Sequence, residues 1–317
     1  MGSLPNVVAR RLWQLLPVVI FATLVVFLLM QLVPGDPALM LAGDYASKAR
    51  IEEIRHLYGF DKPILVQYGI WLWHAVQGDL GNSLFSSEPV TQLILHRMPN
   101  TVLLASYSLV MAAVIGIPLG VLAAVRQGSK LDQLVTGLAS LGVALPSFWL
   151  GIILVVHFSL GLHWFPATGA VPFLQAPLDA LAHLTLPAIA LAVGVVAVLA
   201  RQIRSALLEV LGSQYMRTLR AKGLSPTAVL WKHGMRNISA TMLTIVGLQV
   251  NRLFSGAVVI EAVFAIPGIG SLVSYSAINK DFPVVQGVVL MVVIIVIMVN
   301  LIVDVLSAML DPRVAAA

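Results

Sequence analysis

The feature that most constrains this chain is a series of long apolar stretches, each long enough to cross a lipid bilayer as a helix. A helix rises about 1.5 Å per residue, so about 20 apolar residues span a hydrocarbon core of about 30 Å. The stretches run from Leu12 to Val33, Thr101 to Val125, Leu134 to Leu160, Leu184 to Ile203, Ala240 to Phe264 and Val284 to Met309. They predict an all-α integral membrane protein with about six transmembrane helices, located in the cell (cytoplasmic) membrane as a multi-pass protein.

Composition excludes several other classes of protein. Of the 317 residues, 59% are hydrophobic and 10% are charged, whereas soluble domains carry about 25% charged residues. The formal net charge is +5, but the cations are interleaved with apolar runs, so lipid headgroups explain them better than nucleic acid. The chain has no cysteine and therefore no disulfide, thiolate metal site or thiol nucleophile.

The distribution of lysine and arginine predicts the orientation, because cations that flank short loops are retained on the cytoplasmic side. The segment from Leu160 to His183 contains neither residue, and the connection from Ala265 to Pro283 contains only Lys280. Both connections are therefore expected outside, and both termini are expected in the cytoplasm. The cations expected inside are Arg10, Arg11, Arg126, Lys130, Arg201, Arg204, Arg217, Arg220, Lys222, Lys232 and Arg236.

The segment at 34–100 is long enough to form a small helical extracytoplasmic cap, and we call it the outer segment. Ser47 is a suitable N-cap, and a first short helix is expected to end at Gly59. A second is expected after Pro63 and a third at Pro89. The apolar face of the first helix would be Ile51, Ile54, Leu57 and Tyr58, and the turn between later helices would contain Gly78, Gly81 and Asn82. A membrane-hugging loop rich in aromatics such as Trp71 and Trp73 and a functional gate remain open alternatives.

A second polar segment, residues 212–237, contains residues typical of helix starts and ends, and we call it the coupling segment. Ser213 can cap a short helix ending at Lys222, Gly223 suits the left-handed position that follows, and Ser225 with Pro226 can start a second helix. On the first helix Tyr215, Met216 and Leu219 share one side, while Arg217, Arg220 and Lys222 project elsewhere. The pattern favours a docking surface for a partner protein over simple topological retention, which needs no capped helix pair.

The coupling segment resembles a known family. The run Gln214-Tyr215-Met216-Arg217-Thr218-Leu219-Arg220-Ala221-Lys222-Gly223-Leu224-Ser225 is similar to the coupling segment of ABC importer permeases of the dipeptide/oligopeptide/nickel family. Nearly the whole chain takes part, and the outer Gly-Asp-Leu-Gly region indicates the first, B-type, permease of such systems. The further similar runs are Pro34-Gly35-Asp36-Pro37, Gly78-Asp79-Leu80-Gly81-Asn82-Ser83, Glu261-Ala262-Val263-Phe264-Ala265-Ile266-Pro267-Gly268-Ile269-Gly270, Lys280-Asp281-Phe282-Pro283, Asn300-Leu301-Ile302-Val303-Asp304 and Asp311-Pro312-Arg313. The chain departs from the general importer pattern where a Glu-Ala-Ala triplet would fall on Arg217, Thr218 and Leu219.

The resemblance implies a type I ABC importer permease fold that forms half of a translocation path for dipeptides or oligopeptides. It implies four divisions: 1–33 with the first helix, the cap at 34–100, a five-helix core at 101–309, and a cytoplasmic tail at 310–317. It implies no catalytic residue, metal or cofactor on this chain, because ATP and Mg would be used by partner subunits. The implied partners are a second homologous permease subunit in a heterodimer, two ATPase subunits or domains, and an extracytoplasmic substrate-binding protein. The implied ATPase-coupling residues are Tyr215, Arg217, Thr218, Arg220, Ala221, Lys222, Gly223, Leu224 and Ser225.

Other functions remain as alternatives. A nickel or metal-chelate importer belongs to the same family resemblance. A secondary transporter working alone would show inverted repeats, and a membrane enzyme would show a catalytic constellation; the sequence presents neither. It also lacks the Gly-x-x-x-x-Gly-Lys-Ser/Thr pattern that cradles nucleotide phosphates. The histidines nearest the outer side, His157, His163 and His183, lack the His-x-x-x-His spacing of a zinc enzyme and favour interfacial packing.

Polar residues within the predicted spans are candidates for function, because a charge in lipid is costly and normally faces a partner or a water-filled path. Arg252, near the middle of the fifth stretch, is the sharpest of these. Lining of the translocation path and an intramembrane ion pair are equally supported for it. The candidates are Asn251, Arg252, Glu261, Asn300 and Asp304.

Overall fold

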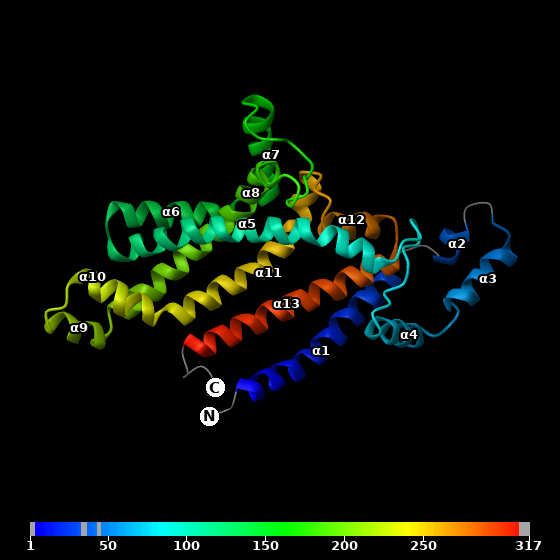
Figure 1. The fold of residues 1–317 in the computed structure, drawn as a ribbon, viewed down its shortest axis with the longest axis horizontal. Helices are drawn as coiled ribbons and strands as arrows, with labels where there is room; N and C mark the ends of the chain where they lie inside the picture. Colours follow the sequence, from blue (N-terminus) through cyan, green and yellow to red (C-terminus); the bar gives the residue numbers. More distant parts are fainter. Residues whose placement is uncertain (1–3, 33–36, 43–45, 311–317) are drawn as a thin grey trace. The chain divides into compact units, whose positions relative to one another are not determined.

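The computed structural model describes residues 4–32, 37–42 and 46–310 and is almost entirely helical (Figure 1). An antiparallel bridge between Asn82 and Pro89 is the one β-type pairing in these residues. The helices in chain order are α1 (Leu4–Gln31), α2 (Pro37–Ala42), α3 (Lys48–Tyr58), α4 (Ile64–Val76), α5 (Val90–Val125), α6 (Lys130–Ala144), α7 (Ser147–Leu154), η1 (Val155–Gly161), α8 (Pro177–Leu211), α9 (Gln214–Ala221), α10 (Pro226–Ala228), η2 (Val229–Met235), α11 (Ser239–Val263), α12 (Ile269–Ile278) and α13 (Phe282–Leu310).

The predicted spans correspond to helices of sufficient length, with some differences. By length and apolarity four helices of the described chain can cross a membrane, namely α5, α8, α11 and α13, and α6 with α7–η1 makes five if the bent pair counts as one. The first predicted span, Leu12–Val33, corresponds to most of the 28-residue helix α1. The structure therefore confirms the all-α membrane fold, with four or five spans where about six were expected.

The third predicted span is not one straight helix, which corrects the sequence-based expectation. α6 and the helical stretch Ser147–Gly161 meet at an angle of 97°. Leu145 is extended, with φ −74° and ψ 124°, because the ring of the following Pro146 disfavours the helical region for the residue before it. The fourth span, predicted at Leu184–Ile203, lies within the longer, 35-residue α8.

The outer segment contains two of its three predicted helices as separate elements. Ser47 accepts a hydrogen bond from the Arg50 amide at 3.3 Å, and α3 ends at Gly59 with φ 70°. α4 follows Pro63 as expected. The helix predicted at Pro89 is not separate, since it forms the first turns of the 36-residue α5.

The predicted apolar face of α3 is only partly buried. Ile54 is 5% exposed, but Leu57 is 76% and Tyr58 is 56% exposed. The residues Pro34, Gly35 and Asp36 of the first family-like run after the predicted span, the run at 311–313 and almost all of the predicted tail lie outside the described residues.

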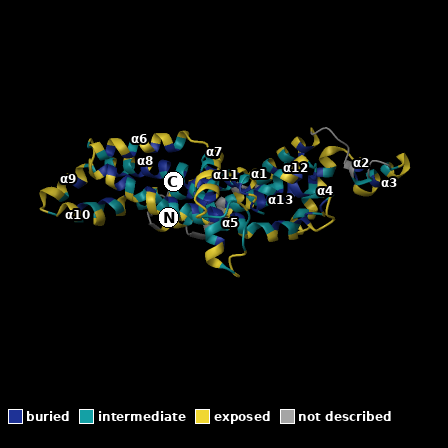
Figure 2. Cartoon of the chain, turned by 90° about the horizontal axis from the view of Figure 1, so that it is seen from above, coloured by how far each residue is buried: buried dark blue, intermediate teal, exposed yellow. Residues whose placement is uncertain are grey.

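The chain divides into two compact units. The first comprises residues 1–9, 100–267 and 298–317, as far as these are described. Its core is built around α8, which packs against α6, α7 and α11 and carries many of the buried residues of this unit (Figure 2). Gly116 and Gly120 of α5 lie against α8, where a Cβ atom on Gly120 would stand 2.7 Å from the carbonyl oxygen of Ala200. Small residues thus permit close helix packing, as in other membrane helix pairs.

The second unit comprises residues 10–99 and 268–297. Its main core cluster joins the start of α5 to α12 and α13 through Val90, Ile94, Ile269, Leu272, Val284 and Val288. Tyr68 of α4 donates a hydrogen bond to the Ile20 carbonyl of α1 at 3.0 Å, and its hydroxyl lies 3.0 Å from that of Thr23. These contacts anchor α4 to α1.

Candidate coupling and translocation sites

The coupling segment has the predicted helix–turn–helix structure. Ser213 accepts a hydrogen bond from the Met216 amide at 3.4 Å and begins α9. Gly223 has φ 83°, a left-handed conformation that favours glycine. Ser225 then caps α10 by accepting from the Ala228 amide at 3.3 Å. The chain continues from α10 as the π-helix η2, a detail that helical periodicity does not predict.

Specific contacts hold the helix pair in place. Met216 is fully buried, and Val229 at the start of η2 is 2% exposed. The Tyr215 hydroxyl lies 2.9 Å from His233 Nδ1, which ties α9 to η2. Arg220 donates to the carbonyl of Leu211 in α8 at 3.1 Å. The pair is therefore a defined surface and not a slack loop.

The opposite side of the coupling segment is exposed and cationic. Arg217 of α9 and Lys222 beside it are exposed, and neither forms an ion pair with any described residue. Of the nine predicted coupling residues, Leu224 is half-buried and the other eight are exposed. The nine residues are Tyr215, Arg217, Thr218, Arg220, Ala221, Lys222, Gly223, Leu224 and Ser225. Such a surface can receive a partner that carries acidic and apolar groups.

Arg252 lies at the middle of α11 with its side chain exposed. It lines a cavity of about 250 Å³ together with Leu145 and Pro146 at the α6–α7 break and Gly194 of α8. No described carboxylate lies within ion-pairing distance of it. The guanidinium therefore needs water, a solute or a group on another chain to solvate it.

The other intramembrane candidates lie at different helix contacts. Asn251 donates to the Asn300 side chain at 3.3 Å, which joins α11 to α13. Glu261 is fully buried and accepts from the Thr101 hydroxyl of α5 at 2.5 Å. Asp304 is partly buried on α13. The five predicted residues thus form no common cluster, and Thr101 was not anticipated.

An ion pair that sequence reasoning missed lies between α6 and α8. Arg204, expected only as a topological cation, donates through Nε and Nη2 to the two carboxylate oxygens of Asp132, at 2.5 and 2.7 Å. Asp132 is 4% exposed and also accepts from the Gly128 amide at 2.9 Å. The available signal was an acid three residues after Ser129, at the start of an apolar helix.

Two of the family-like runs meet in the second unit. Asp281 accepts a hydrogen bond from the Ser83 hydroxyl at 2.5 Å and from the Leu84 amide at 3.1 Å. Both Asp281 and Ser83 are buried. The contact joins the Gly78–Ser83 run to the Lys280–Pro283 run and gives both a structural role.

The histidines expected to pack at the surface make local contacts. Nδ1 of His157 in η1 lies 2.9 Å from the Ile153 carbonyl of α7, and Nδ1 of His183 lies 2.8 Å from the Asp179 carbonyl, each four residues earlier in the chain. Within the described residues no group of three or more histidine, cysteine, aspartate or glutamate side chains is placed to hold a metal ion.

Long packed apolar helices, a broken span and a capped polar helix pair are the features of a helical, multi-pass membrane protein. Residues 116–316 match the family described as "Binding-protein-dependent transport system inner membrane component", and residues 5–105 match its N-terminal companion. The chain belongs to this family of ABC importer permeases. It is a multi-pass membrane subunit, and the family places ATP hydrolysis in separate subunits.

Relatives match over almost the full length. The chain is 44% identical to a putative peptide transport system permease protein of Brucella suis biovar 1 (strain 1330) over 97% of this chain and 98% of the relative. It is 40% identical to the oligopeptide transport system permease protein AppB of Bacillus subtilis (strain 168), over 97% and 98%. It is 39% identical to the glutathione transport system permease protein GsiC of Salmonella typhimurium (strain LT2), over 98% of each.

Among solved structures, the fold is similar to a chain of the MetNI methionine ABC transporter in an inward-facing conformation. The TM-score is 0.59 at 22% identity, and the match covers 71% of this chain and 99% of the other. This likeness supports the type I importer permease fold.

Proposed function

We propose that this chain forms one half of the translocation path of an ATP-driven importer of short peptides, delivered by an extracytoplasmic binding protein. The peptide class rests on the relatives, whose names specify peptide, oligopeptide and glutathione transport. The observation that carries the mechanism is the capped and cationic coupling segment, because a subunit without a nucleotide site needs a surface that receives force from an ATPase.

The coupling residues are assigned as follows. Met216 and Val229 anchor the helix pair, while Arg217 and Lys222 present outward cations that have no ion-pair partner among the described residues. An ATPase groove with complementary acidic groups would bind this surface, and closure of two ATPases on ATP and Mg would move α9 together with η2. Because Arg220 is bound to the Leu211 carbonyl, such a movement would pass directly to α8.

The assembly that follows has a second homologous permease as heterodimer partner and two ATPase subunits or domains. The termini and the coupling segment would face the cytoplasm, and the outer segment at 34–100 would face the binding protein. Arg252 is assigned to the translocation path, where it lines the cavity at the α6–α7 break. Asn251, Asn300, Glu261 and Asp304 are assigned to packing between spans, because Asn251 contacts Asn300 and Glu261 is bound to α5.

Co-purification tests the coupling surface. The chain is co-expressed with its second permease and candidate ATPase subunits, and the retained ATPase is quantified after detergent extraction. Arg217→Glu should remove most of the bound ATPase, because it reverses a charge on the exposed surface. Gly223→Pro should do the same by forbidding the left-handed turn.

Arg126→Glu is the matched control, since Arg126 is exposed and carries the same charge but lies in the α5–α6 connection. It should retain the ATPase. Equal loss for Arg217→Glu and Arg126→Glu would show a non-specific charge effect and refute the docking surface. Peptide uptake into liposomes by the chain alone, without ATP, would refute the importer.

A further inference from the structure

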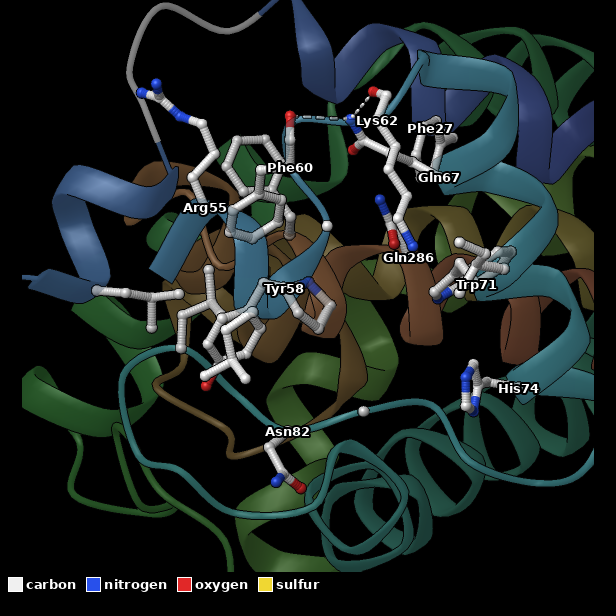
Figure 3. Close-up of a pocket in the computed structure, with 18 of the residues that line it drawn as sticks. Phe27, Arg55, Tyr58, Phe60, Lys62, Gln67, Trp71, His74, Asn82 and Gln286 are labelled. Carbon is white, nitrogen blue, oxygen red and sulfur yellow. Dashed lines mark hydrogen bonds between the residues drawn. The ribbon is translucent and has the colours of Figure 1, made fainter. Parts of the chain in front are cut away.

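The second unit contains a cavity of about 850 Å³ that none of the assigned roles uses. Its walls come from the end of α1, α2, α3, the α3–α4 turn, α4, the loop at 81–87 and the first two turns of α13 (Figure 3). The volume falls within the range of about 300 to 1,000 Å³ typical of small-molecule sites. The cavity is thus large enough for a small ligand.

The charge of the lining is one-sided. Arg55 and Lys62 contribute cations, and no aspartate or glutamate of the described chain lines the cavity. Arg55 is ion-paired with Glu52 at 3.0 Å, whereas Lys62 has no ion-pair partner among the described residues. Lys62 is therefore the cation available to a bound anion.

The turn that carries Lys62 is held in position. Gln67 donates from Nε2 to the Lys62 carbonyl at 2.8 Å and to the Phe60 carbonyl at 3.2 Å. The left-handed Gly59 completes the turn with φ 70°. In Figure 3 Lys62, Gln67, Trp71 and Gln286 gather on one side of the cavity. The cation is thus presented beside polar groups from α4 and α13.

Two of these polar side chains, Trp71 and Gln286, have no hydrogen-bond partner among the described residues. Trp71 Nε1 is a buried donor with no hydrogen-bond acceptor in the described part of the chain. Gln286 is 8% exposed, and its side chain makes no hydrogen bond to another described residue. A buried donor without an acceptor costs free energy, so such groups indicate a ligand or water that completes them.

The remaining lining is aromatic. Tyr58 and Phe60 stack with ring centroids 5.8 Å apart, and Phe27 contributes a third ring. Carboxylate recognition by Lys62, amide recognition by Trp71 and Gln286, and apolar contact with these rings together describe one ligand chemistry: a short peptide with a free carboxyl terminus.

We propose that this cavity is a binding site for a short peptide on the permease itself, with the peptide's C-terminal carboxylate at Lys62. The inference rests on the proposed function for its substrate class and for the outer location of the segment. Peptide released from the binding protein would be held here before it enters the translocation path.

The test is titration calorimetry of the full chain in lipid nanodiscs, without a binding protein. The probes are the tripeptide Gly-Leu-Phe and the same tripeptide with a C-terminal amide. Wild type should bind the free acid about tenfold more tightly than the amide, as expected for one charge-assisted hydrogen bond. Lys62→Gln should bring this ratio close to one. Trp71→Phe should weaken both probes by a similar, smaller factor.

Lys48→Gln is the control, because Lys48 is an exposed lysine of α3 that does not line the cavity; the ratio should stay at its wild-type value. Absence of tripeptide binding, or a ratio unchanged by Lys62→Gln, overturns the proposal. The proposal is also overturned if Lys62→Gln weakens binding of the solute-binding protein but leaves tripeptide binding unchanged. ATP-driven uptake by the complete transporter is measured in parallel. If the wild type takes up peptide and Lys62→Gln leaves uptake and binding unchanged, the site is contradicted and the proposed function is not. If peptide binding depends on Lys62 but the complete transporter shows no ATP-driven uptake, the proposed function is contradicted and the site is not.

Discussion

In the α6–α8 region Arg204 donates two hydrogen bonds to the buried Asp132, whereas in the adjoining coupling segment Arg217 and Lys222 are exposed without an ion-pair partner in the described chain. Both regions belong to the same compact unit and contribute to the positive charge that predicts the orientation. The first uses its cation to fasten two helices, whereas the cations of the second make no ion pair within the described chain and are accessible to another molecule. Charge alone therefore does not distinguish a structural arginine from an accessible one, but the partners within the chain do.

The largest loss of stability should follow from breaking the Asp132–Arg204 pair. Arg204→Met leaves a buried carboxylate without its guanidinium, which is strongly destabilising because the remaining charge stays desolvated. We expect the thermal midpoint of the detergent-purified chain to fall further than it does for Gly120→Val or Ser213→Ala.

Arg201→Met is the matched control on the same helix, since Arg201 is exposed and its side chain forms no ion pair or hydrogen bond with a described residue. The double variant Asp132→Leu with Arg204→Met should recover much of the loss, because an apolar pair can replace a buried ion pair. An equal midpoint for Arg204→Met and Arg201→Met would show that the pair does not fasten α6 to α8.

A smaller loss should follow from separating α5 and α8 at their closest approach. Gly120→Val places a Cβ 2.7 Å from the Ala200 carbonyl and 3.0 Å from Ile203 Cβ, so backbone must move. Overpacking of this kind costs about 1–3 kcal/mol. Gly137→Val is the control, because nothing lies within 4 Å of a Cβ at Gly137. The thermal midpoint should fall for the first variant and hold for the second.

The coupling segment should respond more locally. Ser213→Ala removes the N-cap of α9, a change worth about 1 kcal/mol. Hydrogen exchange should speed up at the α9 amides, residues 214–221, while α8 remains protected. Ser213→Asp should restore protection, and Ser205→Ala, at an exposed position on α8, should leave it unchanged. Uniform deprotection of α8 and α9 by Ser213→Ala would mean that the segment is not a separate unit.

Helix-capping residues explain why the sequence predicts these helix boundaries well. Ser47, Gly59, Ser213, Gly223 and Ser225 act through hydrogen bonds and dihedral angles within a few residues, and the structure confirms each as a helix boundary. Apolar length likewise predicts the membrane fold, although Pro146 divides one expected span.

Contacts between distant residues explain what the sequence does not predict. The Asp132–Arg204 pair joins residues 72 positions apart, and Ser83–Asp281 joins residues 198 apart. No periodicity links such positions, so only packing reveals them. The hydrogen bond between Asn251 and Asn300 is likewise not predictable from the sequence. It gives Asn251 a partner within the chain.

Arg252 is a further exposed cation, in the middle of a membrane span. Like Arg217 and Lys222, it has no acidic partner in the described chain. Arg252→Gln should leave the thermal midpoint close to wild type, because no contact within the chain is lost and changes of this kind are usually within about 0.5 kcal/mol. Peptide uptake by the assembled transporter should fall, because the cation at the α6–α7 break would no longer stabilise a passing carboxylate. Arg252→Lys keeps the charge and should retain part of the uptake. If Arg252→Gln instead dissociates the two permeases, the arginine pairs with an acid on the second subunit, and its assignment to the path is wrong. If uptake and assembly are both unchanged, Arg252 is solvated by water alone, and the distinction between held and available cations does not extend into the membrane.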